Sequence, residues 1–206
     1  LAIWPFAIGL AISVAFAAAN AGFLLSFAFA LQSERGETPL MTGLLHMPFG
    51  LGAMFGIAVL GRKFLPRFGK WVMVAGGLLM AVAVALVLAG IGVLALSWPV
   101  LAPILVLAGI GMGALSGSIA PISVAQVDND HAGAASGLLK TAQQLGGALG
   151  IALAGSVYFA WRGNASFPPS LATVGVVSGL LVLSVTLAVR LPNRIFVPIE
   201  AAAPKE

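Results

Sequence analysis

Two side chains that can carry charge lie inside long apolar stretches of this sequence. His46 lies within the uncharged stretch 40–60, and Lys140 lies within the apolar stretch 134–160. An ionisable group inside a bilayer is costly, so a residue of this kind suggests a functional role. Protonation of His46 near neutral pH suits a proton-coupled step, whereas a neutral histidine bonded to a neighbouring helix needs no such role.

Lys140 shares helical spacing with other polar residues, namely Ser136 and either Gln143 or Gln144. These polar residues on one helix face predict the wall of a substrate cavity. The residues expected to contact a substrate are His46, Lys140, Gln143 and Gln144. A lysine that extends its side chain to the cytoplasmic membrane surface is the simpler alternative. Because no Asp or Glu lies inside the apolar stretches, the main carboxylate of any proton coupling is expected elsewhere.

Other kinds of chemistry find little support. The sequence has no cysteine and two histidines, so neither a disulfide nor a metal site is expected. The motifs HExxH, GxSxG and the P-loop are absent, and the glycines from Gly109 to Gly113 lie inside an apolar run rather than after a strand. We therefore expect no enzyme and no cofactor. Nucleic acid is excluded because the basic residues lie between apolar runs.

The elements that must position His46 and Lys140 are membrane-spanning helices. Of 206 residues 60% are hydrophobic and 8% are charged, against about a quarter charged in soluble domains. A crossing takes about 20 helical residues, and runs of suitable length predict one bundle of six spans, at residues 3–31, 40–60, 71–94, 99–125, 134–160 and 171–189. The fold class is an all-α membrane protein, and lipid is its first partner.

The basic residues predict the orientation of the spans. One side holds Arg62, Lys63, Arg67, Lys70, Arg190, Arg194 and Lys205, and the other side holds Arg35 and Arg162. Positively charged loops face the cytoplasm. Both ends are therefore expected in the cytoplasm and the protein in the cell (inner) membrane, with Gly61 to Lys70 as a basic cytoplasmic loop. The chain opens at Leu1 inside an apolar run, without a signal-peptide pattern, and reads as a fragment.

Small residues recur every four positions in three of the expected spans. Helices in lipid associate through the close approach that small residues permit. We expect helix packing at Gly52 and Gly56 in the second span, at Gly146 and Gly150 in the fifth, and along the fourth span at Gly109, Gly113, Gly117 and Pro121. Pro48, Pro103 and Pro121 fall inside spans and predict kinks, which serve either gating or packing.

Two ordered motifs carry a family resemblance. Leu31-Gln32, Gly36, Thr38-Pro39-Leu40, Gly43-Leu44 and Pro48 resemble a signature of fourteen-span drug:proton antiporters of the EmrB/QacA type, in the major facilitator superfamily. Gly133, Ala135 to Leu138 and Gln144 to Gly150 resemble a second one. Gln143 replaces that family's usual Arg. Arg67, Gly69 and Lys70 are similar to the end of the superfamily's GxxxDRxGRR loop, in which Pro66 replaces the Asp.

The resemblance implies that the chain corresponds to the last six spans, one half of a major facilitator fold. It implies proton-coupled export of lipophilic small molecules by alternating access, with the amino-terminal half, substrate and proton as partners. Pro39, Gly43 and Pro48 would then be structural or gating positions. A membrane scaffold or assembly subunit that uses the glycine faces for association is the alternative reading.

Overall fold

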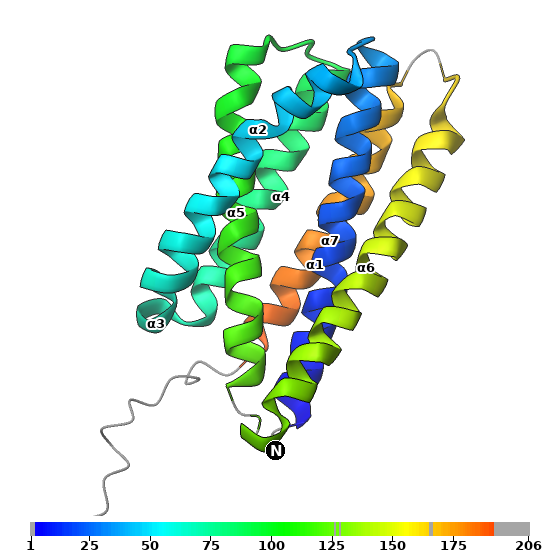
Figure 1. The fold of residues 1–206 in the computed structure, drawn as a ribbon. Coiled ribbons are helices and arrows are strands. Elements are labelled where there is room, and N and C mark those ends of the chain that lie inside the picture. The colour runs from blue at the N-terminus through cyan, green and yellow to red at the C-terminus, as the bar shows by residue number, and fades with distance from the viewer. Residues whose placement is uncertain (1–2, 126, 128, 165–166, 192–206) are drawn as a thin grey trace, which may run out of the picture.

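The computed structural model describes residues 3–125, 127, 129–164 and 167–191. These residues fold into a helical bundle (Figure 1). Its long helices are α1 Ile3–Phe29, α2 Pro39–Phe55, α4 Lys70–Gly92, α5 Trp98–Val124, α6 Ala132–Trp161 and α7 Pro169–Val189. Within the described part, six helical segments are long and apolar enough to cross a membrane, which confirms the expected all-α membrane fold.

Short helical segments extend two of these helices. The π-helix η1, Ala30–Glu34, continues α1, and the π-helix η2, Gly56–Phe64, continues α2 into the short helix α3, Leu65–Phe68. A 3₁₀ turn, η3 Asn129–His131, precedes α6. Arg194 and Lys205, which the sequence analysis counted among the basic residues of one side, lie outside the described residues.

The expected basic loop from Gly61 to Lys70 is wrong as a loop, because nearly all of it is helical. Charged residues do not break a helix, and Pro66 falls in the first turn of α3, where its missing N–H costs nothing. The chain turns instead at Gly69, whose φ of 55° and ψ of −134° suit glycine alone. Lys70 already belongs to α4.

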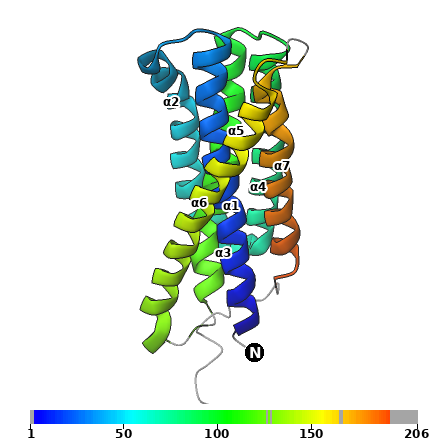
Figure 2. The ribbon, with the colours of Figure 1, turned by 90° about the vertical axis from the view of Figure 1, so that its right-hand side faces the viewer.

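Two long helices organise the packing. α1 packs against α6 and α7, α5 packs against α2 and α4, and α4 also meets α7 (Figures 1 and 2). Glycines allow the backbones to touch: a methyl group at Gly150 would collide with the carbonyl oxygen of Ala18, and one at Gly109 with that of Phe49. At Gly117 the atom nearest to an added methyl group would be 3.5 Å away, an ordinary contact. The close backbone approach of α5 therefore includes Gly109 and Gly113 but not Gly117.

Charged side chains form hydrogen bonds with the ends of neighbouring helices. At one end the Glu34 carboxylate accepts hydrogen bonds from the Ser170 N–H (2.8 Å) and hydroxyl (2.7 Å), and Arg35 donates to the carbonyl of Leu96 (2.9 Å). At the other end Lys70 is only 8% exposed, and its Nζ donates to the Leu191 carbonyl (2.7 Å). Such bonds satisfy carbonyls that the end of α7 leaves open, so Lys70 acts as a cap rather than as an exposed cation.

Candidate functional site

The predicted residue His46 lies in an aromatic cluster between α1 and α2. Its ring centroid is 5.2 Å from that of Phe27, 4.8 Å from that of Phe49 and 6.3 Å from that of Phe23. The side chain is half-buried, and the structure gives its ring no hydrogen bond to any described residue. Its position therefore combines an apolar contact surface with ring nitrogens that remain available for a ligand.

Asn20 adds a polar group on the same side of α1. It precedes Phe23 by three residues and Phe27 by seven, the spacing of one helix face. Its Oδ1 is buried and has no hydrogen-bond partner in the described structure. A buried polar atom without a partner is destabilising, so a ligand that bonds to it would gain affinity. In the sequence Asn20 is visible as an amide within a long apolar stretch, which suits either a weak polar contact in a cavity or a hydrogen bond within the bundle.

The outer face of α2 is apolar and rich in methionine. Leu44, Met47, Leu51 and Met54 follow one another at intervals of three or four residues, so they share one face. All are exposed, Met47 to 57% and Met54 to 70%. Methionine adapts its shape easily and is common at surfaces that accept many ligands. Sequence reasoning missed this face, although the seven-residue spacing of the two methionines was visible.

The exposed side of α6 carries a few polar residues among large apolar ones such as Leu145 and Leu149. Lys140 and Gln144, four residues apart, are exposed, and Gln143 is half-buried. Gly146 and Gly150 face the opposite way, against Val14 and Ala18 of α1. Lys140 and Gln144 thus share the exposed side of α6, and Gln143 is less accessible. His46 is not part of this group: it lies on α2, and its ring contacts Phe27 of α1 and Phe49 of α2.

The remaining predicted positions have structural surroundings. Pro39 opens α2 after Thr38, whose hydroxyl caps the helix by accepting the Met41 N–H at 3.2 Å. Gly43 is exposed, and a methyl group there would meet nothing within 4 Å. Pro48 and Pro121 lie inside α2 and α5. Among the described residues, no cluster of His, Asp or Glu is able to hold a metal ion.

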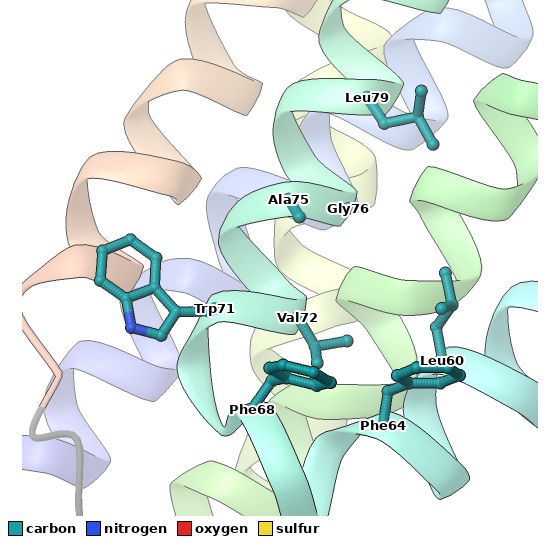
Figure 3. A pocket seen from close by; sticks show the side chains of 8 residues that line it. All are labelled: Leu60, Phe64, Phe68, Trp71, Val72, Ala75, Gly76 and Leu79. Atoms are coloured by element: carbon teal, nitrogen blue, oxygen red, sulfur yellow. The ribbon is translucent and has the colours of Figure 1, made fainter.

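The basic end carries a groove of about 310 Å³ between η2–α3 and α4 (Figure 3). Leu60, Phe64 and Phe68 line one wall. The α4 wall comprises Trp71, Val72, Ala75, Gly76 and Leu79. The rings of Phe64 and Phe68 stack with their centroids 5.9 Å apart. We call this the aromatic groove. Arg62, Lys63 and Arg67 are exposed beside it.

Comparison with known proteins decides the family. Residues 2–151 match the sequence profile described as Major Facilitator Superfamily, which is more than half of the chain. The chain belongs to the major facilitator superfamily. Membership in this superfamily of membrane transporters agrees with the expected absence of enzyme activity and with a multi-pass membrane location.

Relatives within the superfamily have names drawn from export and resistance. The chain is 33% identical over 162 residues to the probable actinorhodin transporter of Streptomyces coelicolor, covering 77% of the chain and 28% of that protein. It is 31% identical over 144 residues to the puromycin resistance protein pur8 of Streptomyces alboniger (66% and 27%). It is 30% identical over 150 residues to the drug efflux pump JefA of Mycobacterium tuberculosis (70% and 28%). The aligned region therefore spans little more than a quarter of each relative.

Proposed function

We propose that this major facilitator chain forms one six-helix half of a drug exporter that works by alternating access. Its relatives are named for actinorhodin transport, puromycin resistance and drug efflux, which supports export of lipophilic small molecules. Since the aligned region covers only 28%, 27% and 28% of those three proteins, a second bundle is expected to complete the transporter. The midplane cavity would lie between the two bundles.

The polar stripe on α6 carries this proposal. Lys140 and Gln144 are exposed on a helix that is apolar enough to span a membrane. Polar and charged groups at such positions face a water-filled cavity or another protein surface rather than lipid. α2 and α6 also bury the smallest shares of residues among the six spans. We therefore place the partner bundle and the cavity against these two helices.

The composition of this surface fits a lipophilic substrate. The methionine face of α2 supplies adaptable apolar contacts, and the cluster of His46 with Phe23, Phe27 and Phe49 supplies aromatic ones. Asn20 offers an unused carbonyl oxygen for orientation. Small-molecule sites commonly combine a largely apolar wall with a few polar groups of this kind.

Proton coupling and topology complete the proposal. His46 would take up and release the proton on this half, and the principal carboxylate would belong to the partner bundle, because Glu34 is engaged by Ser170. The two sequence motifs support the fourteen-span EmrB/QacA type. The basic ends of η2 and α4 support an inner-membrane protein whose termini in this segment face the cytoplasm.

Proteoliposomes test the proposal. The full-length protein should move ethidium across the bilayer when a pH gradient is imposed, and dissipating the gradient should stop the movement. His46→Phe keeps a ring against its neighbours but removes the ring nitrogens, so transport should lose most of its dependence on pH between about 5 and 8. Leu86→Phe, on the exposed face of α4, is the control and should transport normally.

Each result bears on a different part of the proposal. Transport that ignores the gradient would remove proton coupling, and an unchanged pH profile in His46→Phe would remove this residue from it. If the wild-type protein moved neither ethidium nor puromycin nor any other lipophilic cation, the alternative that it is a membrane scaffold or assembly subunit would be the better account.

A further inference from the structure

The aromatic groove lies between η2–α3 and α4, away from the cavity surface proposed along α2 and α6. η2 and α4 both pack against α5, and they touch each other little, so the space between them forms the groove. Figure 3 shows the rings of Phe64 and Phe68 at one end of it, with Leu79 towards the other end. This arrangement leaves an elongated apolar space that opens on the surface of the bundle beside α4.

The lining of the groove suits a hydrocarbon chain. Every side chain that lines it is apolar, apart from the indole N–H of Trp71. A site for a drug-like molecule normally adds several placed polar groups, which fix the orientation of the ligand. A groove without such groups discriminates only by shape and apolar contact. A lipid acyl chain needs nothing more than this.

The charges beside the groove select a negatively charged headgroup. Lys63 and Arg67 are exposed next to the lining residues Phe64 and Phe68, and the Arg67 guanidinium carbon lies 5.6 Å from the centre of the Phe68 ring. The segment 56–70 contains no Asp or Glu. Lys70 takes no part, because its amine is bound to the end of α7. Clustered Lys and Arg side chains at a membrane surface attract anionic lipid, and they repel lipophilic cations.

The aromatic side chains place the groove near the membrane surface. Trp71 is 54% exposed and Phe68 46% exposed, close to the basic ends of η2 and α4. Tryptophan is enriched at the headgroup level of a bilayer. A phosphate bound by Lys63 and Arg67 would therefore lie at the level of the headgroups, with an acyl chain directed along α4 towards Leu79.

We infer that the aromatic groove binds one anionic phospholipid of the surrounding leaflet, with an acyl chain in the groove and the phosphate held by Lys63 and Arg67. The lipid would fill the space between η2 and α4 and join these two helices in the bilayer. The inference concerns the outer surface of the bundle and does not depend on transport.

Trp71 provides the measurement. The full-length protein is placed in bilayers that contain phosphatidylcholine and either brominated phosphatidylglycerol or brominated phosphatidylcholine. Bromine quenches indole fluorescence on contact, and subtracting the signal of Trp71→Phe isolates the groove. We expect phosphatidylglycerol to bind at Trp71 about fivefold or more tightly than phosphatidylcholine, since each cation near an anionic surface contributes an attraction of this order.

Matched variants separate the two parts of the site. Ala75→Phe fills the groove and should abolish the lipid preference, whereas Val82→Phe places the same ring on the exposed face of α4 outside the groove and should not. The double variant Lys63→Gln with Arg67→Gln should also abolish the preference. Arg190→Gln removes an exposed charge at the end of α7, which does not line the groove, and should leave the preference intact.

Three results would overturn the inference. The first is equal quenching by the two lipids in the wild-type protein, and the second is a preference that survives loss of both cations. The third is relief of the quenching by tetraphenylphosphonium, which would identify the groove as a drug site. The substituted cations are exposed and form no ion pair in the described structure, so their variants should fold normally. Elution of every variant as a single symmetric peak provides that control.

Discussion

At the scale of single residues, the structure separates polar groups that stabilise the bundle from polar groups that it leaves unused. Lys70, Arg35 and Glu34 are committed to the ends of neighbouring helices. Ser26 donates to the Gly22 carbonyl at 2.8 Å within its own helix. Asn20 is different, because its buried Oδ1 has no partner among the described residues. Unused groups of this kind are the ones to test for function.

Asn20→Leu should stabilise the protein and impair its transport. Leucine has a similar size and removes a buried acceptor whose lack of a partner costs about 1–3 kcal/mol, so the free energy of unfolding should rise by up to that amount. The expected readouts are a higher thermal midpoint in detergent and a lower rate of ethidium transport. Stability gained at the expense of activity is typical of residues in binding sites.

Ser26→Ala is the matched control, because that hydroxyl already has a partner and its removal should not raise the midpoint. A lower midpoint for Asn20→Leu would mean that the amide is bonded in the intact protein. It would then be a structural residue and not part of the cavity.

At the scale of helices, uncharged length was enough to locate the spans but not all of their ends. α5 and α7 begin close to where their apolar stretches begin, because Pro stands in the first turn of each. The segment 61–68 was misjudged because its charges suggested a loop, although the chain stays helical as far as Phe68 and Pro66 falls in the first turn of α3. The chain turns at Gly69, where a positive φ favours glycine. This glycine therefore marked the helix end better than the charges did.

Side-chain surroundings could be predicted only where spacing alone determines them. The face shared by Lys140 and Gln144 follows from a four-residue interval, and the buried glycines of α6 lie opposite to it. The aromatic contacts of His46 depend on how α1 crosses α2, and the aromatic groove depends on how far η2 stands from α4. Neither distance is encoded in the spacing of a single helix, so both required the folded arrangement.

Two neighbouring glycines of α6 should respond oppositely to alanine. A methyl group at Gly150 meets the backbone of Ala18, whereas one at Gly147 has only the Ala21 Cβ nearby, at 3.9 Å. Gly150→Ala should force α1 and α6 apart and lower the free energy of unfolding by about 1–3 kcal/mol or more, as overpacking does. Gly147→Ala should be neutral, or stabilising by up to about 1 kcal/mol through better helix propensity.

Thermal midpoints of the two variants in the same detergent compare these effects directly. A destabilised Gly147→Ala, equal to Gly150→Ala, would show that alanine is poorly tolerated along α6 in general. The close approach to α1 would then not be the reason for the glycine.

At the scale of the whole molecule, the two ends of the bundle differ in charge and in the way they are fastened. η2, α3 and the start of α4 contribute the basic cluster, while the starts of α5 and α7 belong to the opposite end (Figure 1). Both the proposed transport direction and the proposed lipid site depend on which end faces the cytoplasm. Because this chain contains no cysteine, single cysteines introduced into it report the orientation cleanly.

Lys63→Cys and Ser97→Cys place thiols at exposed positions of the opposite ends. A membrane-impermeant maleimide should label Ser97→Cys in intact cells and Lys63→Cys only in inverted vesicles, since positively charged segments are retained in the cytoplasm. Any cysteines of the full-length protein outside this chain are first replaced by serine, and that parent should remain unlabelled. Labelling of Lys63→Cys in intact cells would show that the bundle has the opposite orientation in the membrane. The groove would then face the outer leaflet, and the direction of transport assigned to this half would have to be reversed.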